Sequence, residues 1–240
     1  MAVDVNTVYR TVLLIINKEQ RGYLTPDEFN RTAAQVQLEI FNEYFDDLNQ
    51  QLRVPGNDSE YSDRIKNLEE KIAIFQDSGN CIFNSGVFNL PVLTSPYEFY
   101  KLGTVIYNDE KEVQLVQPNE LLELNLSPIT KPSTYWPIYT YKNFKIKVYP
   151  DTITNNISCT FIRKPLNPTW NFTSSAPNYQ YVYTPTTSSV NPSVDFELHP
   201  TEQVNLITRI LLYSGIVIRD PQIVQIAASQ VQTENINSKS

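Results

Sequence analysis

The sequence predicts an α+β protein: a helical bundle of N-terminal and C-terminal helices with an inserted antiparallel β-sandwich or barrel domain. Three observations predict this fold. Apolar residues recur at three- and four-residue spacing before residue 78 and again after Pro200, as in amphipathic helices. Between these regions the apolar period changes to two and turn residues become frequent, as in short strands. Helices at both ends favour a bundle that the C-terminus completes.

Four parts are expected along the chain. Residues 1–78 form the N-terminal helical part, and residues 79–165 form the antiparallel β domain. Residues 166–199 form an extended arm rich in Pro and Tyr, because its prolines forbid a regular central strand. Residues 200–240 supply C-terminal helices that complete the bundle, followed by a frayed polar tail.

The second helix has the strongest start signal. Thr25 is the expected N-cap, Pro26 occupies the first helical position and Glu28 completes a capping box. Apolar residues then follow at helical spacing to about Arg53, where Pro55-Gly56 ends the pattern. Helices are also expected over about 4–18, 59–76 and 200–215, with a restart at Asp220-Pro221.

In the β domain, alternating apolar residues predict five strands. They are Phe99–Tyr107, Glu112–Val116, Trp136–Tyr141, Phe144–Tyr149 and Ile157–Arg163. Asn108-Asp109 is expected to form the hairpin turn between the first two strands.

Composition limits the function classes. The 240 residues include 41% hydrophobic residues, so a substantial core can form. A net charge of -7 argues against a free-standing DNA-binding domain, although it suits the wall of a channel through which DNA slides. Cys81 and Cys159 form no CxxC motif and are expected to be buried hydrophobes in a reducing compartment. The apolar run at 12–16 is too short to span a bilayer, and no signal peptide is expected.

Residues 17–28 imitate a calcium-binding EF-hand loop. Oxygen-bearing side chains occupy loop positions one, three, nine and twelve, and Gly22 occupies position six. Arg21 stands at position five, where a ligand oxygen belongs, and a cation there opposes calcium. We therefore expect a helix-capping turn rather than a metal site.

No catalytic, cofactor-binding or metal-binding residues are expected. The only histidine, His199, stands at a helix start and is predicted to be structural, and no Gly-x-Ser-x-Gly motif accompanies it. The carboxylate pairs Asp46-Asp47 and Glu69-Glu70 are adjacent on helices, so neither pair can face across a cleft. The chain is therefore not expected to be an enzyme.

Two further clusters leave alternatives open. A basic group could touch nucleic acid or an acidic partner, although an ordinary polar strand face is favoured; it comprises Lys142, Lys145, Lys147, Arg163 and Lys164. An aromatic group could stack sugars or bases, although core or interface anchors are more usual; it comprises Tyr135, Trp136, Tyr139, Tyr141 and Trp170.

Several segments resemble virion structural proteins of crAss-like and related tailed phages. They are 17–30 (NKEQxGYLTPxEFN), 35–41 (QxQxEIF), 100–107 (YKLGxVxY), 146–150 (IxVYP) and 158–170 (SCxFIRKPxxPxW). The resemblance implies a tail ring or head-to-tail adaptor protein of the virion tail or neck. It implies a dodecameric ring around the DNA channel below the portal, next to the portal or other ring proteins, with no catalytic motif and no membrane.

The leading hypothesis is therefore a structural subunit of a phage tail or neck ring, made in the host bacterial cytoplasm. A ring needs heterologous contacts, so each subunit must carry two different patches. The alternative is a carbohydrate- or partner-binding module that uses the aromatic-rich β domain.

Overall fold

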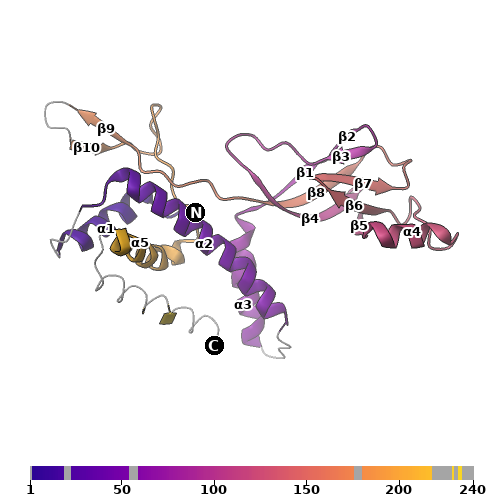
Figure 1. Ribbon diagram of the computed structural model, residues 1–240, viewed down its shortest axis with the longest axis horizontal. Helices are drawn as coiled ribbons and strands as arrows, with labels where there is room; N and C mark the ends of the chain where they lie inside the picture. Colours follow the sequence, from indigo (N-terminus) through magenta and orange to yellow (C-terminus); the bar gives the residue numbers. More distant parts are fainter. Residues whose placement is uncertain are drawn as a thin grey trace. The chain divides into compact units, whose positions relative to one another are not determined.

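The computed structural model describes residues 2–18, 23–53, 59–175 and 180–217, together with 229, 232 and 233. The chain forms two compact units, the second inserted into the first (Figure 1). The discontinuous unit comprises Met1–Ile74 and Pro165–Ser240, and the inserted unit comprises Phe75–Lys164. The predicted Pro55-Gly56 stop and the helix expected from Asp220 lie outside the described residues.

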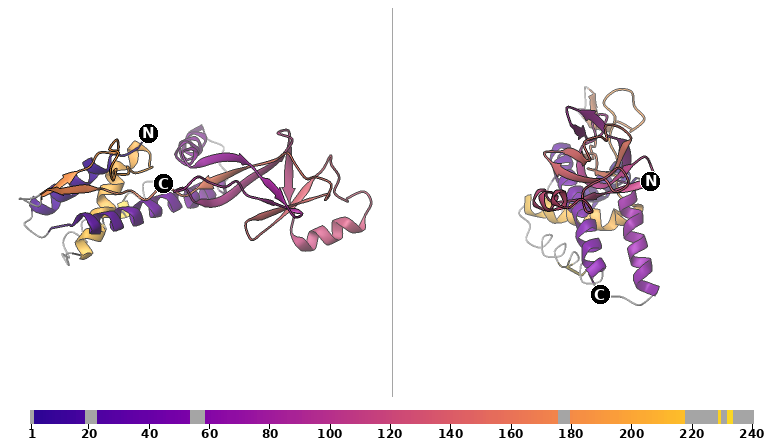
Figure 2. Two further views of the ribbon diagram at one scale, coloured as in Figure 1. Left: turned by 90° about the horizontal axis from the view of Figure 1, so that it is seen from above. Right: turned by 90° about the vertical axis from the view of Figure 1, so that its right-hand side faces the viewer.

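Helices make up much of the discontinuous unit. They are α1 (Val5–Lys18), α2 (Pro26–Arg53), α3 (Ser59–Ala73), a short 3-10 helix η1 (Pro200–Glu202) and α5 (Gln203–Val217). The C-terminal α5, yellow in Figures 1 and 2, packs on α1 and α2, while α3 packs on α2. Fully buried side chains line the contact faces at the expected spacing; they include Val5, Val8, Val12, Phe29, Ala33, Val36, Leu206 and Ile210.

The segment 165–199, which the sequence presents as an extended arm, is extended but largely built into this unit. Val3 and Phe196 exchange two backbone N–H to C=O hydrogen bonds, each with an N–O distance of 3.1 Å, and Phe196 is fully buried. The Gln37 amide donates to the Leu166 carbonyl at 2.6 Å and its oxygen accepts from the Glu197 N–H at 3.0 Å. These bonds satisfy a backbone C=O and a backbone N–H that would otherwise need a neighbouring strand as partner.

A two-stranded antiparallel ribbon continues from this segment. It is formed by β9 (Phe172–Ser175) and β10 (Gln180–Tyr183). The aromatic residues of both strands contact Trp170 or one another, so the ribbon is held to the unit by ring stacking.

The inserted unit is built on one eight-stranded sheet with the order β1-β8-β4-β5-β6-β7-β3-β2. Its strands are β1 (Gln76–Asn80), β2 (Ile82–Asn84), β3 (Val87–Asn89), β4 (Phe99–Tyr107), β5 (Lys111–Leu115), β6 (Ile138–Lys142), β7 (Lys145–Tyr149) and β8 (Ile157–Arg163). Strands β1 and β2 stand at opposite ends of this order, yet only Cys81 separates them in the chain. The sheet must therefore curl until its two edges nearly meet.

One strand pair departs from the antiparallel pattern. Strands β5 and β6 run parallel, with Gln114 opposite Ile138 and Leu115 opposite Tyr139. Parallel neighbours need a crossover connection. The helix α4 (Pro118–Leu126) lies in that connection and packs Leu121 against Val116 and Ile138.

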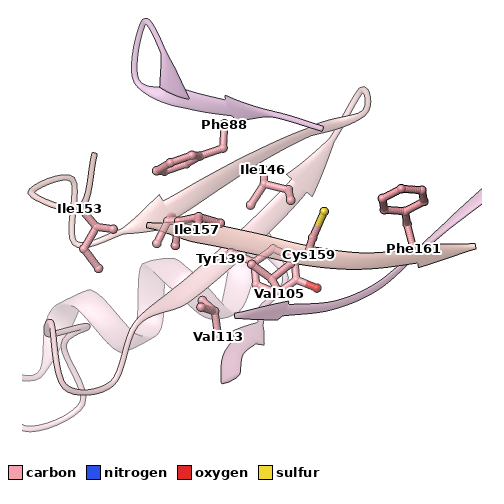
Figure 3. Close-up of a cluster of buried hydrophobic side chains, with 10 residues drawn as sticks. Phe88, Val105, Val113, Tyr139, Ile146, Ile153, Ile157, Cys159 and Phe161 are labelled. Carbon is pink, nitrogen blue, oxygen red and sulfur yellow. The ribbon is translucent and has the colours of Figure 1, made fainter. Parts of the chain in front are cut away.

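The core of the inserted unit lies inside the curled sheet (Figure 3). Along β8 the burial alternates with period two, as expected for a strand with one face inward. Inward side chains come from both halves of the strand order; they are Phe88, Val105, Val113, Tyr139, Ile146, Val148, Ile153, Ile157, Cys159 and Phe161.

The predicted fold class is wrong in its emphasis and in its sheet type, although an inserted β domain is present. The protein is α+β, but its dominant feature is a large mixed, nearly closed sheet rather than a helical bundle. Strand β1 escaped prediction because its residues, QDSGN, are polar and mostly exposed, so they show no alternation. The crossover through α4 makes the sheet mixed, and the sequence signal for this nine-residue helix is weak.

Gly103 allows strands β4 and β8 to approach closely. The register between these strands shifts between Leu102 and Val105, and the Thr160 hydroxyl accepts from the Thr104 N–H at 2.8 Å. A Cβ at Gly103 would lie 2.6 Å from the Thr160 hydroxyl oxygen and 3.0 Å from its carbonyl oxygen. Only glycine fits this bulge without displacing the strand.

Gly103→Ala is expected to lower the free energy of unfolding of the inserted unit by about 1–3 kcal/mol, because the bulge must open. Urea unfolding followed by circular dichroism measures the change. Thr104→Ala is the control, since this neighbouring side chain is exposed and should alter stability by less than about 0.5 kcal/mol. Equal stability of G103A and wild type would contradict the role of the close approach.

Candidate functional site

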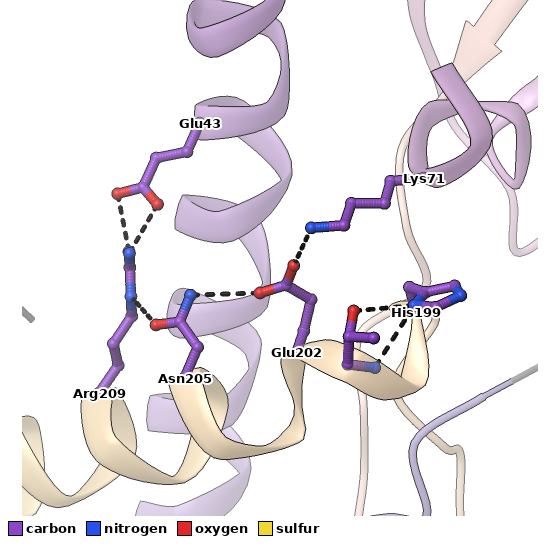
Figure 4. A network of polar contacts seen from close by, with 7 residues as sticks. Glu43, Lys71, His199, Glu202, Asn205 and Arg209 are labelled. Atoms are coloured by element: carbon purple, nitrogen blue, oxygen red, sulfur yellow. Dashed lines mark hydrogen bonds and ion pairs between the residues drawn. The ribbon is translucent and has the colours of Figure 1, made fainter. Parts of the chain in front are cut away.

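A network of polar side chains in the discontinuous unit lies next to the protein's only histidine, which bonds Thr201 separately (Figure 4). Arg209 of α5 is 5% exposed and donates two bonds to the Glu43 carboxylate of α2, at 2.8 and 2.6 Å. Its Nε donates to the Asn205 side-chain oxygen at 2.7 Å. This fork geometry is the strong form of an arginine–carboxylate pair.

The network continues through Glu202 at the end of η1. Its carboxylate accepts from the Asn205 amide at 3.2 Å and from the Lys71 ammonium of α3 at 2.6 Å. Lys71 also lies 5.4 Å from the centre of the Tyr44 ring. Burial, and next the nearby Glu202 carboxylate, raise the pKa of the Tyr44 hydroxyl well above its usual range, so this group stays neutral.

His199 is the N-cap of η1. Its Nδ1 accepts from the Thr201 N–H at 3.4 Å and lies 2.8 Å from the Thr201 hydroxyl oxygen. No nucleophile with an adjacent base appears in this arrangement. The network ties α2, α3 and α5 together, and its geometry is that of a structural clamp.

The capping box at the start of α2 is present. The Glu28 carboxylate accepts from the Thr25 N–H at 2.9 Å and from its hydroxyl at 2.7 Å, and these bonds lower the pKa of Glu28. Glu28 is therefore engaged in capping, as the sequence predicts. Residues 19–22 of the calcium-like loop lie outside the described residues.

The candidate carboxylates do not converge. Asp46, Glu69 and Glu70 are exposed on helices, and the side chain of Asp47 lies outside the described part. Among the described residues, no three His, Cys, Asp or Glu side chains gather in a group able to hold a metal ion.

The basic cluster of the sequence is divided among local partners in the inserted unit. Arg163 lies 4.5 Å from the centre of the Tyr97 ring, and Lys164 pairs with Glu98 at 2.9 Å. Lys147 lies 3.9 Å from the Asp151 carboxylate. Lys142 and Lys145 face each other across the exposed end of the β6–β7 hairpin. These residues form no single concave basic surface, which is what phosphate binding would use.

The aromatic cluster of the sequence is also separated by the fold. Tyr139 is buried in the core of the inserted unit, whereas Tyr135 and Trp136 are 74% and 81% exposed. Trp170 belongs to the discontinuous unit and is 4% exposed. Trp136 and Trp170 therefore belong to different units, and each needs its own explanation.

Trp170 forms the wall of an aromatic pocket of about 490 Å³ in the discontinuous unit. Its ring lies 4.4 Å from that of Tyr9 and stacks 5.9 Å from that of Tyr183, measured between centres. The indole N–H donates to the Asn6 side-chain oxygen at 3.2 Å, which fixes the ring. The complete lining is Tyr9, Arg10, Leu13, Tyr23, Trp170, Tyr181 and Tyr183.

Arg10 supplies the positive charge of this aromatic pocket. Burial, and next the neighbouring Tyr23, raise the pKa of Tyr9 far above its usual value, and burial also raises the pKa of Tyr23. These hydroxyls are therefore neutral at physiological pH. Among the described residues Arg10 has no acidic side chain within ion-pair distance. The pocket suits an apolar or aromatic group accompanied by a negative charge.

A second surface is formed by α4 and the chain that follows it in the inserted unit. Leu121 and Leu124 face the small core beside β6, but Leu122 and Leu126, four residues apart, are 69% and 85% exposed. Ile129 is 94% exposed. A short helix that is apolar on both faces is typical of one that is covered on both faces.

Sequence reasoning missed both surfaces. The pocket combines residues that are distant in the chain, and only Trp170 was singled out. For α4 a signal was available: in LLELNL, residues 121–126, the leucines spread over a wider arc of the helix than one buried face needs.

No known family matches this chain by sequence, and no curated protein is significantly similar to it. None of the described helices has both the length and the apolar content needed to cross a bilayer.

Arg209→Ala is expected to lower the free energy of unfolding of the discontinuous unit by about 1.5–3 kcal/mol, because the buried guanidinium loses its charge-assisted bonds to Glu43, whose side chain is 42% exposed. The free energy of unfolding of Arg209→Lys should lie between those of wild type and R209A, since lysine keeps the charge but cannot form the two-bond fork. Chemical denaturation measures both. Arg31→Ala is the control, because its pair with Asp27 is 81% and 75% exposed and should contribute less than about 0.5 kcal/mol. A loss in R31A as large as in R209A would contradict the clamp.

Proposed function

We propose that this protein is a structural, non-catalytic subunit of a homo-oligomeric ring, with the tail or neck of a tailed phage as the ring's setting. The observation that carries the proposal is the exposed apolar outer face of α4. The phage setting, the dodecameric number and a place beside the portal rest on the resemblance of the sequence segments alone.

The outer face of α4 supports a subunit contact. Leu122, Leu126 and Ile129 are large apolar side chains that water surrounds in the isolated chain. Burying each of them would contribute about 1.5–3 kcal/mol of transfer free energy. Leu122 and Leu126 on the helix and Ile129 just after it, followed in the chain by exposed Tyr135 and Trp136, have the composition of an interface core.

The aromatic pocket is the surface that we propose receives this helix on the next copy. A ring needs two different complementary patches on each subunit, and these two surfaces lie on different units of the chain. Their charges are complementary: Arg10 has no acidic partner among the described residues, and Glu123 is an exposed carboxylate beside Leu122. The contact would pair Arg10 with Glu123 and place leucines against tyrosine rings.

The acidic character of the chain is consistent with a DNA channel. A net charge of -7 per subunit repels the phosphate backbone, so DNA would pass without being held. Lys147 and Lys164 each lie beside a carboxylate, so their positive charges are partly neutralised and would hold passing DNA less strongly.

Leu126→Glu is expected to dissociate the oligomer while the subunit remains folded, because this side chain is 85% exposed in the isolated chain. Light scattering after size-exclusion chromatography and electron microscopy measure the state of assembly. Asn125→Glu is the matched control, since it adds the same charge at an exposed neighbouring position of α4 and removes no apolar group. A wild-type protein that stays monomeric at high concentration would exclude the ring.

A charge exchange tests the pairing of the two surfaces. Arg10→Glu and Glu123→Arg should each weaken assembly about tenfold, and the double variant should recover most of the loss. Analytical ultracentrifugation across protein concentrations measures the dissociation constants. Additive losses in the double variant would show that the two residues do not meet, even if the ring itself forms.

A carbohydrate-binding module remains the second candidate, because Tyr135 and Trp136 present exposed rings side by side in the chain. A glycan array separates the two hypotheses. Trp136→Ala would abolish glycan capture without changing the oligomer in a binding module, and would weaken assembly without any glycan signal in a ring subunit.

A further inference from the structure

The two cysteines of the inserted unit, 78 positions apart in the chain, lie side by side. Cys81 follows β1 and Cys159 lies in β8, and their sulfurs are 3.4 Å apart. Cys81 also donates its backbone N–H to the Ile157 carbonyl at 2.8 Å, which holds it against β8. The sequence predicts two buried hydrophobes; instead only Cys159 is buried, and Cys81 is partly exposed.

A polar cavity of about 350 Å³ opens beside Cys81. Its lining is mostly amide, hydroxyl and carboxylate side chains: Asn80, Cys81, Asn108, Asp109, Asn156, Ile157 and Ser158. The turn that supplies Asp109 is fixed, because its carboxylate accepts from the Ser158 hydroxyl at 3.2 Å and the Asn156 amide donates to Asn108 at 2.9 Å. Cys81 therefore belongs both to the lining of a preformed polar cavity and to the edge of the apolar cluster that contains Cys159.

The two sulfurs differ in character. The hydrogen bond that Cys81 shares with Cys159 lowers the pKa of Cys81, while that bond and burial raise the pKa of Cys159. Cys81 therefore holds the thiolate more readily, and the thiolate is the attacking form in thiol–disulfide exchange. Cys159 keeps its proton and stands in the position of a resolving thiol.

We propose that Cys81 and Cys159 form a thiol–disulfide exchange site whose substrate is a small neutral or cationic disulfide that enters the polar cavity. The Cys81 thiolate attacks one sulfur of the disulfide R–S–S–R, a bond forms between Cys81 and that sulfur, and RS⁻ leaves. The released RS⁻ takes the proton of Cys159, and the Cys159 thiolate then attacks the Cys81 sulfur, forms the intramolecular disulfide and expels the second RS⁻. The protons of the two cysteines end on the two released thiols, and the small disulfide is the oxidant.

The geometry supports the second step. Formation of the disulfide requires the sulfurs to close from 3.4 Å to about 2.05 Å. Cys81 and Cys159 belong to neighbouring, hydrogen-bonded chain segments, since Gly79 pairs with Cys159 two residues before Cys81. The pairing of β1 with β8 holds the two segments together while the sulfurs close this distance.

Asp109 gives the site its charge preference. It places a carboxylate in the lining of the cavity that the reagent must enter. A cationic disulfide is attracted there and an anionic one is repelled. Among cationic and anionic disulfides of similar size, the cationic reagent should therefore react faster.

The test exposes the folded full chain to cystamine, a cationic disulfide, and identifies the products by intact mass and peptide mapping. The wild type should lose two protons and yield a peptide that links Cys81 to Cys159. Cys159→Ser should stop at one retained cysteamine adduct on Cys81, and Cys81→Ser should stay unmodified. Two free thiols in wild type after exposure would overturn the proposal, and that result does not depend on whether the variants fold.

The charge preference has its own measurement. Cystamine should react with wild type about five times faster, or more, than 3,3′-dithiodipropionate, an anionic disulfide of similar size. Asp109→Asn should reduce this ratio, and asparagine tolerates the positive φ of 55° at this position. Glu110→Gln is the matched control: it removes the same charge from an exposed neighbour outside the cavity lining and should leave most of the ratio unchanged. Equal ratios in wild type and D109N would show that Asp109 does not select the substrate.

Discussion

One residue, Cys81, connects the two edges of the eight-stranded sheet, and this short connection constrains the whole inserted unit. Because β1 and β2 are consecutive in the chain but outermost in the strand order, the sheet has to curl around its own core. The curl brings side chains from both halves of the strand order, such as Phe88 and Val105, into one cluster. It also protects the edges, which an open sheet of this size would expose to other chains.

The same closure explains why α4 lies on the outside. The interior is filled by strand side chains, so the crossover between β5 and β6 packs only Leu121 and Leu124 against the sheet and turns its remaining leucines outward. In the discontinuous unit the polar side chains around Arg209 and Glu202 bond one another, and a separate pocket beside Trp170 is lined by aromatic rings. Each unit thus carries an exposed or open apolar surface in addition to its core.

Sequence periodicity predicts the elements whose burial alternates and fails where tertiary contacts decide. Strand β8 has the predicted bounds and alternating burial, whereas β4 has the predicted bounds although its register shifts interrupt the alternation. Strand β1 is polar and exposed, so only its pairing with β8 defines it. The Thr25 capping box is local and was predicted, whereas the contact of Cys81 with Cys159 depends on the register of two strands 78 residues apart. The aromatic pocket likewise requires Tyr9, Trp170 and Tyr183 to meet, which no local pattern encodes.

The two strands that join the inserted unit to the rest of the chain are neighbours, and this has a mechanical consequence. Gln76, where β1 begins, lies opposite Ile162, near the end of β8, so both connections leave from the same end of an antiparallel pair. A force that draws these two connections away from each other would open the pair one ladder bond at a time, from Gln76 towards Asn80. The junction therefore yields at lower force than a sheared pair of equal length, and the last bonds to carry load are those nearest Cys81.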